Sequence, residues 1–328
     1  MTHAASNWKS RRVLVTGATG FVGSWLVKAL LERQAQVIAL VRDFDHQSEM
    51  VRSGAIRHVT VVNGCLEDYA AVERAVNEHE VDTVFHLAAQ SLVGVALRNP
   101  LATFEANIRG TYHVLEACRV YSDLVKAVIV ASSDKAYGDS EKLPYTEDHP
   151  LVGRHPYDVS KSCADLLASA YHHTYALPLA IARCGNIYGG GDLNWSRIVP
   201  GTVRSLLHGE RPLVRSDGSP VRDYFYVEDA AAAYVTLAEQ IERPEVAGHA
   251  FNFSTESQVT VRELVETIQS VLGAGHLTPV VQGQVQHEIK RQTLSAARAR
   301  TVLGWSAKHD LRDGLAETIK WYRAFLNR

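Results

Sequence analysis

Several features are scarce in this sequence, and each scarcity excludes a class of protein. The four cysteines are scattered, with no Cys-x-x-Cys pair and no His-x-x-x-His pattern, so neither a disulfide framework nor a zinc or other metal site is expected. No apolar run approaches the length of a membrane span, and the lead at residues 2–10 is polar rather than an apolar signal segment. Neither sign of charge is in excess, because 34 basic and 36 acidic residues leave a formal net charge of -2. We therefore expect a cytoplasmic protein that binds neither a membrane nor a nucleic acid.

A glycine-rich turn stands between the first expected strand and the first expected helix. An apolar strand at residues 12–16 runs directly into Gly17-x-x-Gly20-x-x-Gly23, and a helical pattern follows. This order is typical of the start of a dinucleotide-binding unit, in which the glycines permit a tight turn and the pyrophosphate lies at the helix amino terminus. The alternative is a plain turn between a strand and a helix.

Short apolar segments rich in β-branched residues recur along the first half of the chain. We expect strands at residues 12–16, 36–41, 58–63, 83–86, 126–132 and 179–183. Helical patterns separate them, at residues 24–33, 69–78, 100–120 and 156–175. Alternating strands and helices of this length predict an α/β fold with a doubly wound parallel (Rossmann) sheet and helices on both of its faces.

Glycine and proline become frequent after residue 185, and the regular alternation ends. The later patterns predict a helix at residues 200–207, loops at 209–220, a strand at 222–227, a helix at 228–239, a strand at 250–254, and helices near 260–272 and 311–326. We expect residues 1–185 to form a dinucleotide-binding domain to which residues 222–254 return. Residues 186–221 and 255–328 are expected to form a smaller C-terminal α/β domain that binds the substrate.

One expected strand breaks abruptly into the polar run Ser133-Asp134-Lys135. Open α/β sheets bind ligands at the carboxyl ends of their strands. Tyr157 and Lys161 begin a later helical pattern, and their four-residue spacing places them one turn apart on one face. We therefore expect these five side chains to meet in one cleft. The alternatives are a solvated helix face for the Tyr/Lys pair and a water-facing ion pair for Asp134 and Lys135.

These motifs together resemble the extended short-chain dehydrogenase/reductases that act on nucleotide sugars, the NAD-dependent epimerase/dehydratase family. The resemblance covers nearly the whole chain and rests on Gly17-x-x-Gly20-x-x-Gly23, His86-Leu-Ala-Ala-Gln90, Asn107-x-x-Gly110-Thr111, Tyr157-x-x-x-Lys161, Arg222-Asp-Tyr and Leu303-Gly-Trp305. Epimerases, decarboxylases and dehydratases share several of these motifs. They imply the fold and the cofactor class rather than the product.

Finer features look most like the CDP-glucose 4,6-dehydratase branch of that family. His86-Leu-Ala-Ala-Gln-Ser91 and the Ser133-Asp134-Lys135 triplet look like the sugar 4,6-dehydratases in general. The features that look like the CDP-glucose branch are Gly185-Asn186-Ile-Tyr-Gly-Gly-Gly-Asp192 with Arg197 and Pro200, and His287-Glu288 upstream of Arg298-Ala-Arg300. By contrast, Arg222-Asp-Tyr-Phe-Tyr looks closer to the epimerase and dTDP-sugar pattern. Arg298 and Arg300 are equally well interpreted as a solvated helix face.

The resemblance implies that Tyr157 takes the proton of the sugar C4 hydroxyl while C4 is oxidised. A tyrosine titrates near ~10, so its anion needs nearby positive charge, which Lys161 and a cationic nicotinamide would supply. Ser133 would orient the same hydroxyl. Loss of water from C5 and C6 would then use Asp134 as the acid and Lys135 as the base. The product would be a 4-keto-6-deoxy sugar.

The resemblance also implies a set of cofactor-binding residues: Gly17, Thr19, Gly20, Phe21, Val22, Gly23, Arg42, Leu66, Ala88, Tyr157 and Lys161. NAD enzymes of this fold usually end the second strand in an acidic residue, whereas Val41 and then Arg42 stand here. Arg42 could pair with the 2′-phosphate of NADP, and Asp43 could reach a ribose. Cys65 replaces the common aspartate of the adenine seat. We expect NAD, with NADP as the alternative.

The substrate is expected to be a nucleotide-diphosphate sugar, held by Gln90, Asn186, Arg197 and Arg222. The planar guanidinium fork suits phosphate oxygens. The leading hypothesis is a lyase, a nucleotide-hexose 4,6-dehydratase acting on a CDP-glucose-like substrate. The alternatives are a 4-epimerase of the UDP-glucose or UDP-glucuronate type, a decarboxylase, and a cofactor-sensing protein on a former enzyme fold. A homodimer is expected from the resemblance alone.

Overall fold

The computed structural model describes residues 8–283 and 289–327, and in this part of the chain seven parallel strands form the main sheet. Their order across the sheet is β11-β6-β5-β4-β1-β2-β3. The chain changes direction across the sheet between β1 and β4, which is where open α/β sheets form their ligand crevice. The predicted doubly wound sheet is therefore confirmed. Its strands are β1 (Arg12–Thr16), β2 (Gln36–Val41), β3 (Thr60–Asn63), β4 (Thr83–His86), β5 (Ala127–Ser133), β6 (Leu179–Cys184) and β11 (Ala250–Phe253).

Helices cover both faces of this sheet, because its strands are apolar on both sides. Val13 and Val15 of β1 pack into one buried cluster, and Leu14 between them packs into another on the opposite face, as the two-residue period of a strand requires. The first cluster contains side chains of α1 (Phe21–Glu32) and α9 (Val227–Glu239). The second contains those of α3 (Tyr69–Asn77), α6 (Gly110–Val120) and α7 (Pro156–Tyr175).

The helix expected at residues 100–120 is interrupted by a π-helical turn. The segment consists of α5 (Pro100–Phe104), the π turn η3 (Glu105–Arg109) and α6. Asn107 lies in the turn, and its side chain accepts a hydrogen bond from the backbone of Gln90 and donates one to Ser160. A π turn inserts one residue into a helix and is frequent at functional sites. Here the π turn coincides with the tertiary contacts of Asn107. The helical periodicity of the sequence did not predict this turn.

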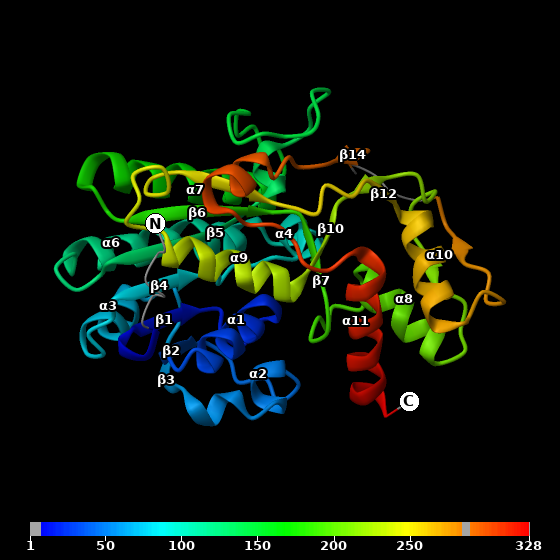
Figure 1. Cartoon of the computed structure of the whole chain (residues 1–328), viewed down its shortest axis with the longest axis horizontal. Coiled ribbons are helices and arrows are strands. Elements are labelled where there is room, and N and C mark those ends of the chain that lie inside the picture. Colours follow the sequence, from blue (N-terminus) through cyan, green and yellow to red (C-terminus); the bar gives the residue numbers. More distant parts are fainter. Residues whose placement is uncertain (1–7, 284–288, 328) are drawn as a thin grey trace.

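The remaining strands and helices lie beside the carboxyl ends of the main-sheet strands. Figure 1 shows α8, α10 and α11 grouped to the right of that sheet. α10 begins directly after Thr260, where Thr260 and Glu263 form a capping box. The elements are β7 (Asn186–Tyr188), α8 (Ile198–Leu207), β8 (Leu213–Val214), β9 (Val221–Arg222), β10 (Tyr224–Tyr226), β12 (Val259–Thr260), α10 (Val261–Leu272), β13 (Val280–Val281), β14 (Arg291–Gln292) and α11 (Leu311–Leu326).

The strand expected at residues 222–227 is corrected to two short strands that do not join the main sheet. β9 pairs with β12 and β14, and β10 pairs with β7. Within the segment 222–254, β11 joins the main sheet by pairing with β6, while α9 and Phe225 of β10 pack into the buried cluster on one of its faces. The strands of two or three residues are specified by their distant partners, so sequence pattern could not separate them. The division into two domains remains a proposal.

Two tryptophan contacts join the two parts of the fold. Trp25 of α1 donates to the main-chain oxygen of Gly190 (2.7 Å), and Trp321 of α11 donates to Glu49 (2.9 Å). Trp321 lies so close to Gly190 that a Cβ there would be 2.3 Å from the indole. The short elements near these contacts and elsewhere are η1 (Trp8–Ser10), α2 (Glu49–Arg52), η2 (Ala55–His58), α4 (Val93–Arg98), η4 (Asp134–Tyr137) and η5 (Ala299–Leu303).

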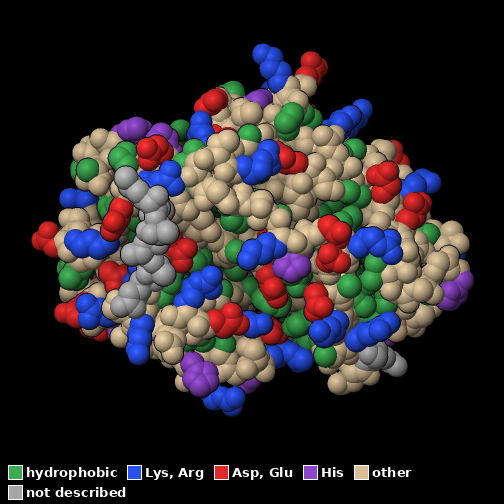
Figure 2. All heavy atoms as spheres, in the orientation of Figure 1, with side chains coloured by type: hydrophobic (Ala, Val, Ile, Leu, Met, Phe, Trp, Pro, Cys, Tyr) green, Lys and Arg blue, Asp and Glu red, His purple; other side chains and the backbone are tan. Residues whose placement is uncertain are grey.

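The surface carries charge of both signs without separation. On the face drawn in Figure 2, basic and acidic side chains are interspersed, which fits the formal net charge of -2. Among the helices of the described residues, none combines the length and the apolar character needed to cross a bilayer.

Candidate active site

A cavity of about 1310 Å³ opens at the carboxyl ends of the main-sheet strands. Its walls come from the loops after β1, β2, β4 and β5, from the start of α7, and from the segment around α8. Every residue that the sequence singled out for chemistry or binding lines it: Gly17, Thr19, Gly20, Phe21, Val22, Gly23, Arg42, Leu66, Ala88, Gln90, Ser133, Asp134, Lys135, Tyr157, Lys161, Asn186, Arg197 and Arg222.

The glycine turn after β1 is closed too tightly for side chains at two positions. Gly17 has φ 72°, in the left-handed region, and a Cβ there would lie 2.8 Å from the backbone of Ala88. A Cβ on Gly23 would lie 2.0 Å from the carbonyl oxygen of Gly17. The helix α1 begins at Phe21, three residues earlier than the pattern predicted, so its amino terminus faces the cavity. The residues present therefore fit a dinucleotide pyrophosphate.

Arg42 and Asp43 at the end of β2 are paired with each other. Arg42 Nε lies 2.6 Å from Asp43 Oδ2, and both side chains are largely exposed. A 2′-phosphate at this place would meet the Asp43 carboxylate as well as the guanidinium. Like charges repel, so the pair disfavours NADP relative to NAD.

A buried histidine connects three elements beneath the cofactor seat. The two ring nitrogens of His86 lie 2.9 Å from Thr16 Oγ1 and 3.0 Å from Thr111 Oγ1. Burial, and then the nearby Lys161, lower the pKa of His86 to about 3, so its ring is neutral. The motifs containing His86 and Thr111 were visible in the sequence, but their mutual contact was not.

The polar run after β5 folds into the 3-10 turn η4. Ser133 Oγ donates to Asp134 Oδ1 (3.0 Å) and accepts from the backbone N–H of Lys135 (3.2 Å). Asp134 is only 3% exposed, which excludes the water-facing alternative for this carboxyl. Burial raises the pKa of Asp134, while Lys135, Ser133 and Arg222 oppose the rise. The net effect is a pKa raised toward the range in which the carboxyl can act as an acid.

Tyr157 and Lys161 lie together on the first turns of α7. Lys161 is 7% exposed and donates to the main-chain oxygen of Ala131 in β5 (2.8 Å). Burial lowers the pKa of Lys161 to about 8. Burial, and then Asp134, raise the pKa of Tyr157 to about 12, although a hydrogen bond with Ser133 opposes this. Tyr157 is therefore a neutral phenol until further positive charge enters the cavity.

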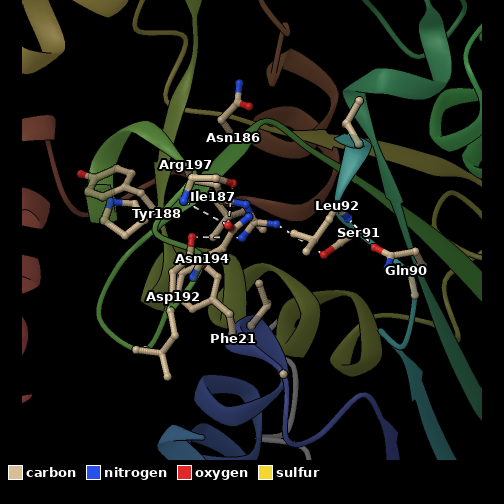
Figure 3. Close-up of a pocket in the computed structure, with 18 of the residues that line it drawn as sticks. Phe21, Gln90, Ser91, Leu92, Asn186, Ile187, Tyr188, Asp192, Asn194 and Arg197 are labelled. Atoms are coloured by element: carbon tan, nitrogen blue, oxygen red, sulfur yellow. Dashed lines mark hydrogen bonds and ion pairs between the residues drawn. The ribbon is translucent and has the colours of Figure 1, made fainter. Parts of the chain in front are cut away.

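Arg197 crosses the cavity between its two walls. Its Nη1 lies 3.0 Å from Asp192 Oδ2, and its Nη2 donates to Ser91 Oγ at 3.4 Å. Figure 3 shows Arg197 extended between these two residues. The side chain of Gln90 instead turns back and accepts from the backbone N–H of Leu92 (2.6 Å). Asp192 was part of a quoted motif but was not expected to pair with Arg197.

The other expected substrate residues differ in their surroundings. Arg222 is buried, donates to the main-chain oxygen of Val221 (2.9 Å) and lies close enough to Asp134 to lower its pKa. The Nδ2 atom of Asn186 is buried and has no hydrogen-bond partner within the described residues. This unpaired amide in a cavity wall is what a ligand-contacting group looks like before its ligand binds.

Two further arginines are structural and lie away from the cavity. Arg298 pairs with Asp148 (3.1 Å), and Arg300 pairs with Glu256 (2.6 Å). His287 and Glu288, which carry part of the resemblance, are outside the described residues. Across residues 8–283 and 289–327, no group of three or more His, Cys, Asp or Glu side chains is arranged to hold a metal ion.

The family model described as GDP-mannose 4,6 dehydratase matches residues 14–318. The chain is 30% identical to a CDP-glucose 4,6-dehydratase of Salmonella typhimurium over 97% of its length and 92% of the relative. Its structure is similar to that of a UDP-glucose 4-epimerase of Thermotoga maritima with UDP-glucose, with a TM-score of 0.87, 28% identity, and coverage of 96% of this chain and 99% of the other. It is also similar to a dTDP-glucose 4,6-dehydratase double mutant of Streptomyces venezuelae with NAD bound, with a TM-score of 0.86, 28% identity, and coverage of 95% and 97%.

Proposed function

The chain belongs to the GDP-mannose 4,6-dehydratase family, and we propose that it is a nucleotide-hexose 4,6-dehydratase acting on CDP-glucose or a closely similar nucleotide sugar. One observation carries this proposal: Asp134 and Lys135 line the same cavity as Tyr157, Lys161 and Ser133. An epimerase needs a base and a charge partner for C4 alone. A dehydratase also needs an acid and a base for C5 and C6, and the buried turn η4 supplies both.

We propose NAD as the cofactor of this reaction. The tight glycine turn sets the amino terminus of α1 in the cavity wall, where a pyrophosphate would lie, and the Arg42–Asp43 pair disfavours a 2′-phosphate. The NAD-bound dTDP-glucose 4,6-dehydratase structure supports this choice. When bound, NAD would supply the redox chemistry that oxidises C4 and later reduces C6 of the sugar.

Tyr157 would act first, as the base that removes the proton from the C4 hydroxyl. Burial and Asp134 raise the pKa of its phenol to about 12, so the base needs the positive charge of Lys161 and of the bound nicotinamide to lower that pKa. Ser133, which shares a hydrogen bond with Tyr157, would hold the same hydroxyl in place. This step leaves a ketone at C4, which makes the C5 proton acidic.

Elimination would follow at the turn η4. The Lys135 amine would take the C5 proton, and the protonated Asp134 would give its proton to the departing C6 hydroxyl, so that one water leaves. Burial of Asp134 supports this assignment, because it raises the pKa of this carboxyl. After C6 has been reduced, a proton returned to C5 completes the 4-keto-6-deoxy sugar.

The nucleotide would lie on the opposite wall of the cavity. Arg197 and Arg222 would face the diphosphate, and the unpaired Asn186 amide would donate to it or to the sugar. Gln90 would need to release Leu92 to contact substrate. The similarity to a CDP-glucose 4,6-dehydratase supports cytosine as the base.

A 4-epimerase is the second candidate function. The similarity to a UDP-glucose 4-epimerase structure and the Arg222-Asp-Tyr pattern favour it. In that case Asp134 and Lys135 would be structural, and only Tyr157, Lys161 and Ser133 would act on the sugar.

Product analysis distinguishes the two candidates. Purified protein would be incubated separately with CDP-, dTDP-, UDP- and GDP-glucose and with GDP-mannose, and each product would be weighed by mass spectrometry and tested for the alkali-induced absorbance of a 4-keto-6-deoxy sugar. A product lighter by one water from CDP-glucose is expected. An isomer of unchanged mass would establish the epimerase. Water loss from a nucleotide sugar other than CDP-glucose, and not from CDP-glucose, would show that the proposed base is wrong.

We also propose that the protein forms a homodimer in the cytoplasm. All four cysteines are free, which supports a reducing compartment such as the cytoplasm.

Three leucines support the dimer, because Leu97, Leu101 and Leu166 are more than half exposed on the adjacent helices α4, α5 and α7. A second copy covering them would remove apolar surface from water. Sedimentation equilibrium of wild type and of Leu101→Glu would test the dimer, and a monomeric wild type would contradict it.

A further inference from the structure

A side chain outside the cavity contacts one of the proposed catalytic groups. The carbonyl oxygen Oε1 of Gln292 accepts a hydrogen bond from Lys135 Nζ. Lys135 lines the cavity, whereas Gln292 is fully buried behind it in β14. β14 pairs in parallel with β9, and this pairing places Gln292 opposite Arg222. A strand far along the chain therefore holds the lysine from behind.

The orientation of the Gln292 amide is explained by this contact alone. Lysine nitrogen offers N–H donors, so the amide must present its oxygen to it. The amide nitrogen Nε2 is then buried without a hydrogen-bond partner among the described residues. A buried unpaired N–H is unfavourable, and such groups in a folded protein call for a reason. Here the reason is the contact that the other end of the amide makes with Lys135.

The charges around Lys135 show why a neutral partner matters. Asp134 lies beside it on the same turn, and Asp158 faces it from α7 together with His155. Arg222 of β9 and the next residue, Asp223, both lie close to Asp134. Carboxylates favour the ammonium form of a lysine, but a base must lose that proton. A glutamine oxygen accepts a hydrogen bond from either form and adds no negative charge.

We propose that Gln292 is a positioning residue, which holds Lys135 toward the sugar while leaving its amine able to lose a proton. The inference rests on the proposed function, because it assigns Gln292 to the elimination step and not to oxidation at C4. It predicts that the identity of residue 292 sets the pH at which Lys135 becomes active. A residue with a merely structural role would not move that pH.

Two variants of Gln292 test the proposal in opposite directions. Gln292→Glu places a carboxylate against Lys135, so the rising limb of the pH profile of kcat for water loss is expected to move up by about one pH unit. Gln292→Met keeps the side-chain volume but removes the hydrogen-bond acceptor, so the rising limb of the pH profile is expected to move to lower pH. In both variants KM should stay within about twofold of wild type, and kcat at neutral pH should fall about tenfold in Gln292→Glu.

The controls separate the possible failures. Gln282→Glu adds the same charge at an exposed position outside the cavity and should leave the profile unchanged. The 4-keto hexose, measured by mass spectrometry after quenching, forms only if a variant is folded and able to oxidise C4. It should still form in Gln292→Met, so this variant tests the proposal even if Gln292→Glu fails to fold. If wild type loses no water, the proposed function fails. If the wild-type enzyme catalyses water loss and the pH profile of Gln292→Met rises at the same pH as that of wild type, the positioning role is overturned.

Discussion

Asp165 and Arg183 form a buried, two-pronged ion pair that ties α7 to β6, with both N–O distances at 2.8 Å. The remaining guanidinium nitrogen of Arg183 donates to Tyr137 Oη (2.9 Å) at the end of η4. Tyr137 in turn donates to Asn252 of β11 (2.7 Å). The pair therefore joins the helix that carries Tyr157 and Lys161 to the turn that carries Asp134 and Lys135.

Breaking this pair should destabilise the protein strongly. Asp165→Asn leaves a buried guanidinium without its counter-charge, and we expect the free energy of unfolding to fall by about 3 kcal/mol. Urea denaturation of Asp165→Asn, with the exposed Asp123→Asn as the control, measures the difference. Equal midpoints in the two variants would show that the pair contributes no net stability.

Replacing the proposed acid should stop the reaction after oxidation. Asp134→Asn keeps the shape of the side chain but cannot give its proton to the C6 hydroxyl, so water loss should slow by about 100-fold or more. Mass spectrometry of quenched samples should then detect a 4-keto hexose two hydrogens lighter than the substrate. Asp139→Asn changes an exposed neighbour outside the cavity and should behave as wild type. Unimpaired water loss in Asp134→Asn would remove this residue from the mechanism.

Removing the buried lysine should abolish activity and stabilise the fold. The folded-state pKa of Lys161 is about 8, below its ordinary value of 10.5, so burying its ammonium costs stability at neutral pH. Lys161→Met escapes this cost but loses the hydrogen bond to Ala131, and we expect a net gain of about 2 kcal/mol at pH 7. The unfolded chain binds more protons between pH 8 and 10.5, so wild-type stability recovers there and the gain should shrink.

Urea denaturation at pH 7 and at pH 10 measures this change, with the exposed Lys126→Met as the control. A gain that stays constant across the two pH values would show that the Lys161 ammonium is not destabilising. Loss of stability in Lys161→Met at pH 7 would show that its hydrogen bond to Ala131 outweighs the cost of burial.

Releasing Arg42 from its neighbour should broaden cofactor choice. Asp43→Asn removes the carboxylate that pairs with Arg42 and that would repel a 2′-phosphate. The ratio of the dissociation constant for NAD to that for NADP, measured by titration of the purified protein, should therefore rise about tenfold. Adding Arg42→Ala in the same chain should cancel the rise. An unchanged ratio in Asp43→Asn would place the ribose away from this pair. High salt should weaken the effect, because both groups are exposed.

Local pattern in the sequence was sufficient for the main sheet, and local pattern together with the family resemblance predicted the residues that line the cavity. The strands β1, β2 and β4 and the helices α7 and α11 begin and end where their apolar periods and flanking residues predicted. The fold class and the family are confirmed. These features depend on side-chain period and on short turns, both of which are properties of neighbouring residues. The roles assigned to Tyr157, Lys161, Ser133, Asp134 and Lys135 remain predictions.

Tertiary structure alone decided the contacts that tune those groups. The Lys135–Gln292 hydrogen bond, the Arg197–Asp192 pair, the π turn at Asn107 and the pairing of β10 with β7 follow from how distant segments meet. Strands of two or three residues carry too little periodicity to be recognised, and the burial that shifts a pKa exists only once both walls of the cavity are in place. The sequence by itself therefore determined which chemical groups gather at the end of the sheet, and packing determined their protonation and their partners.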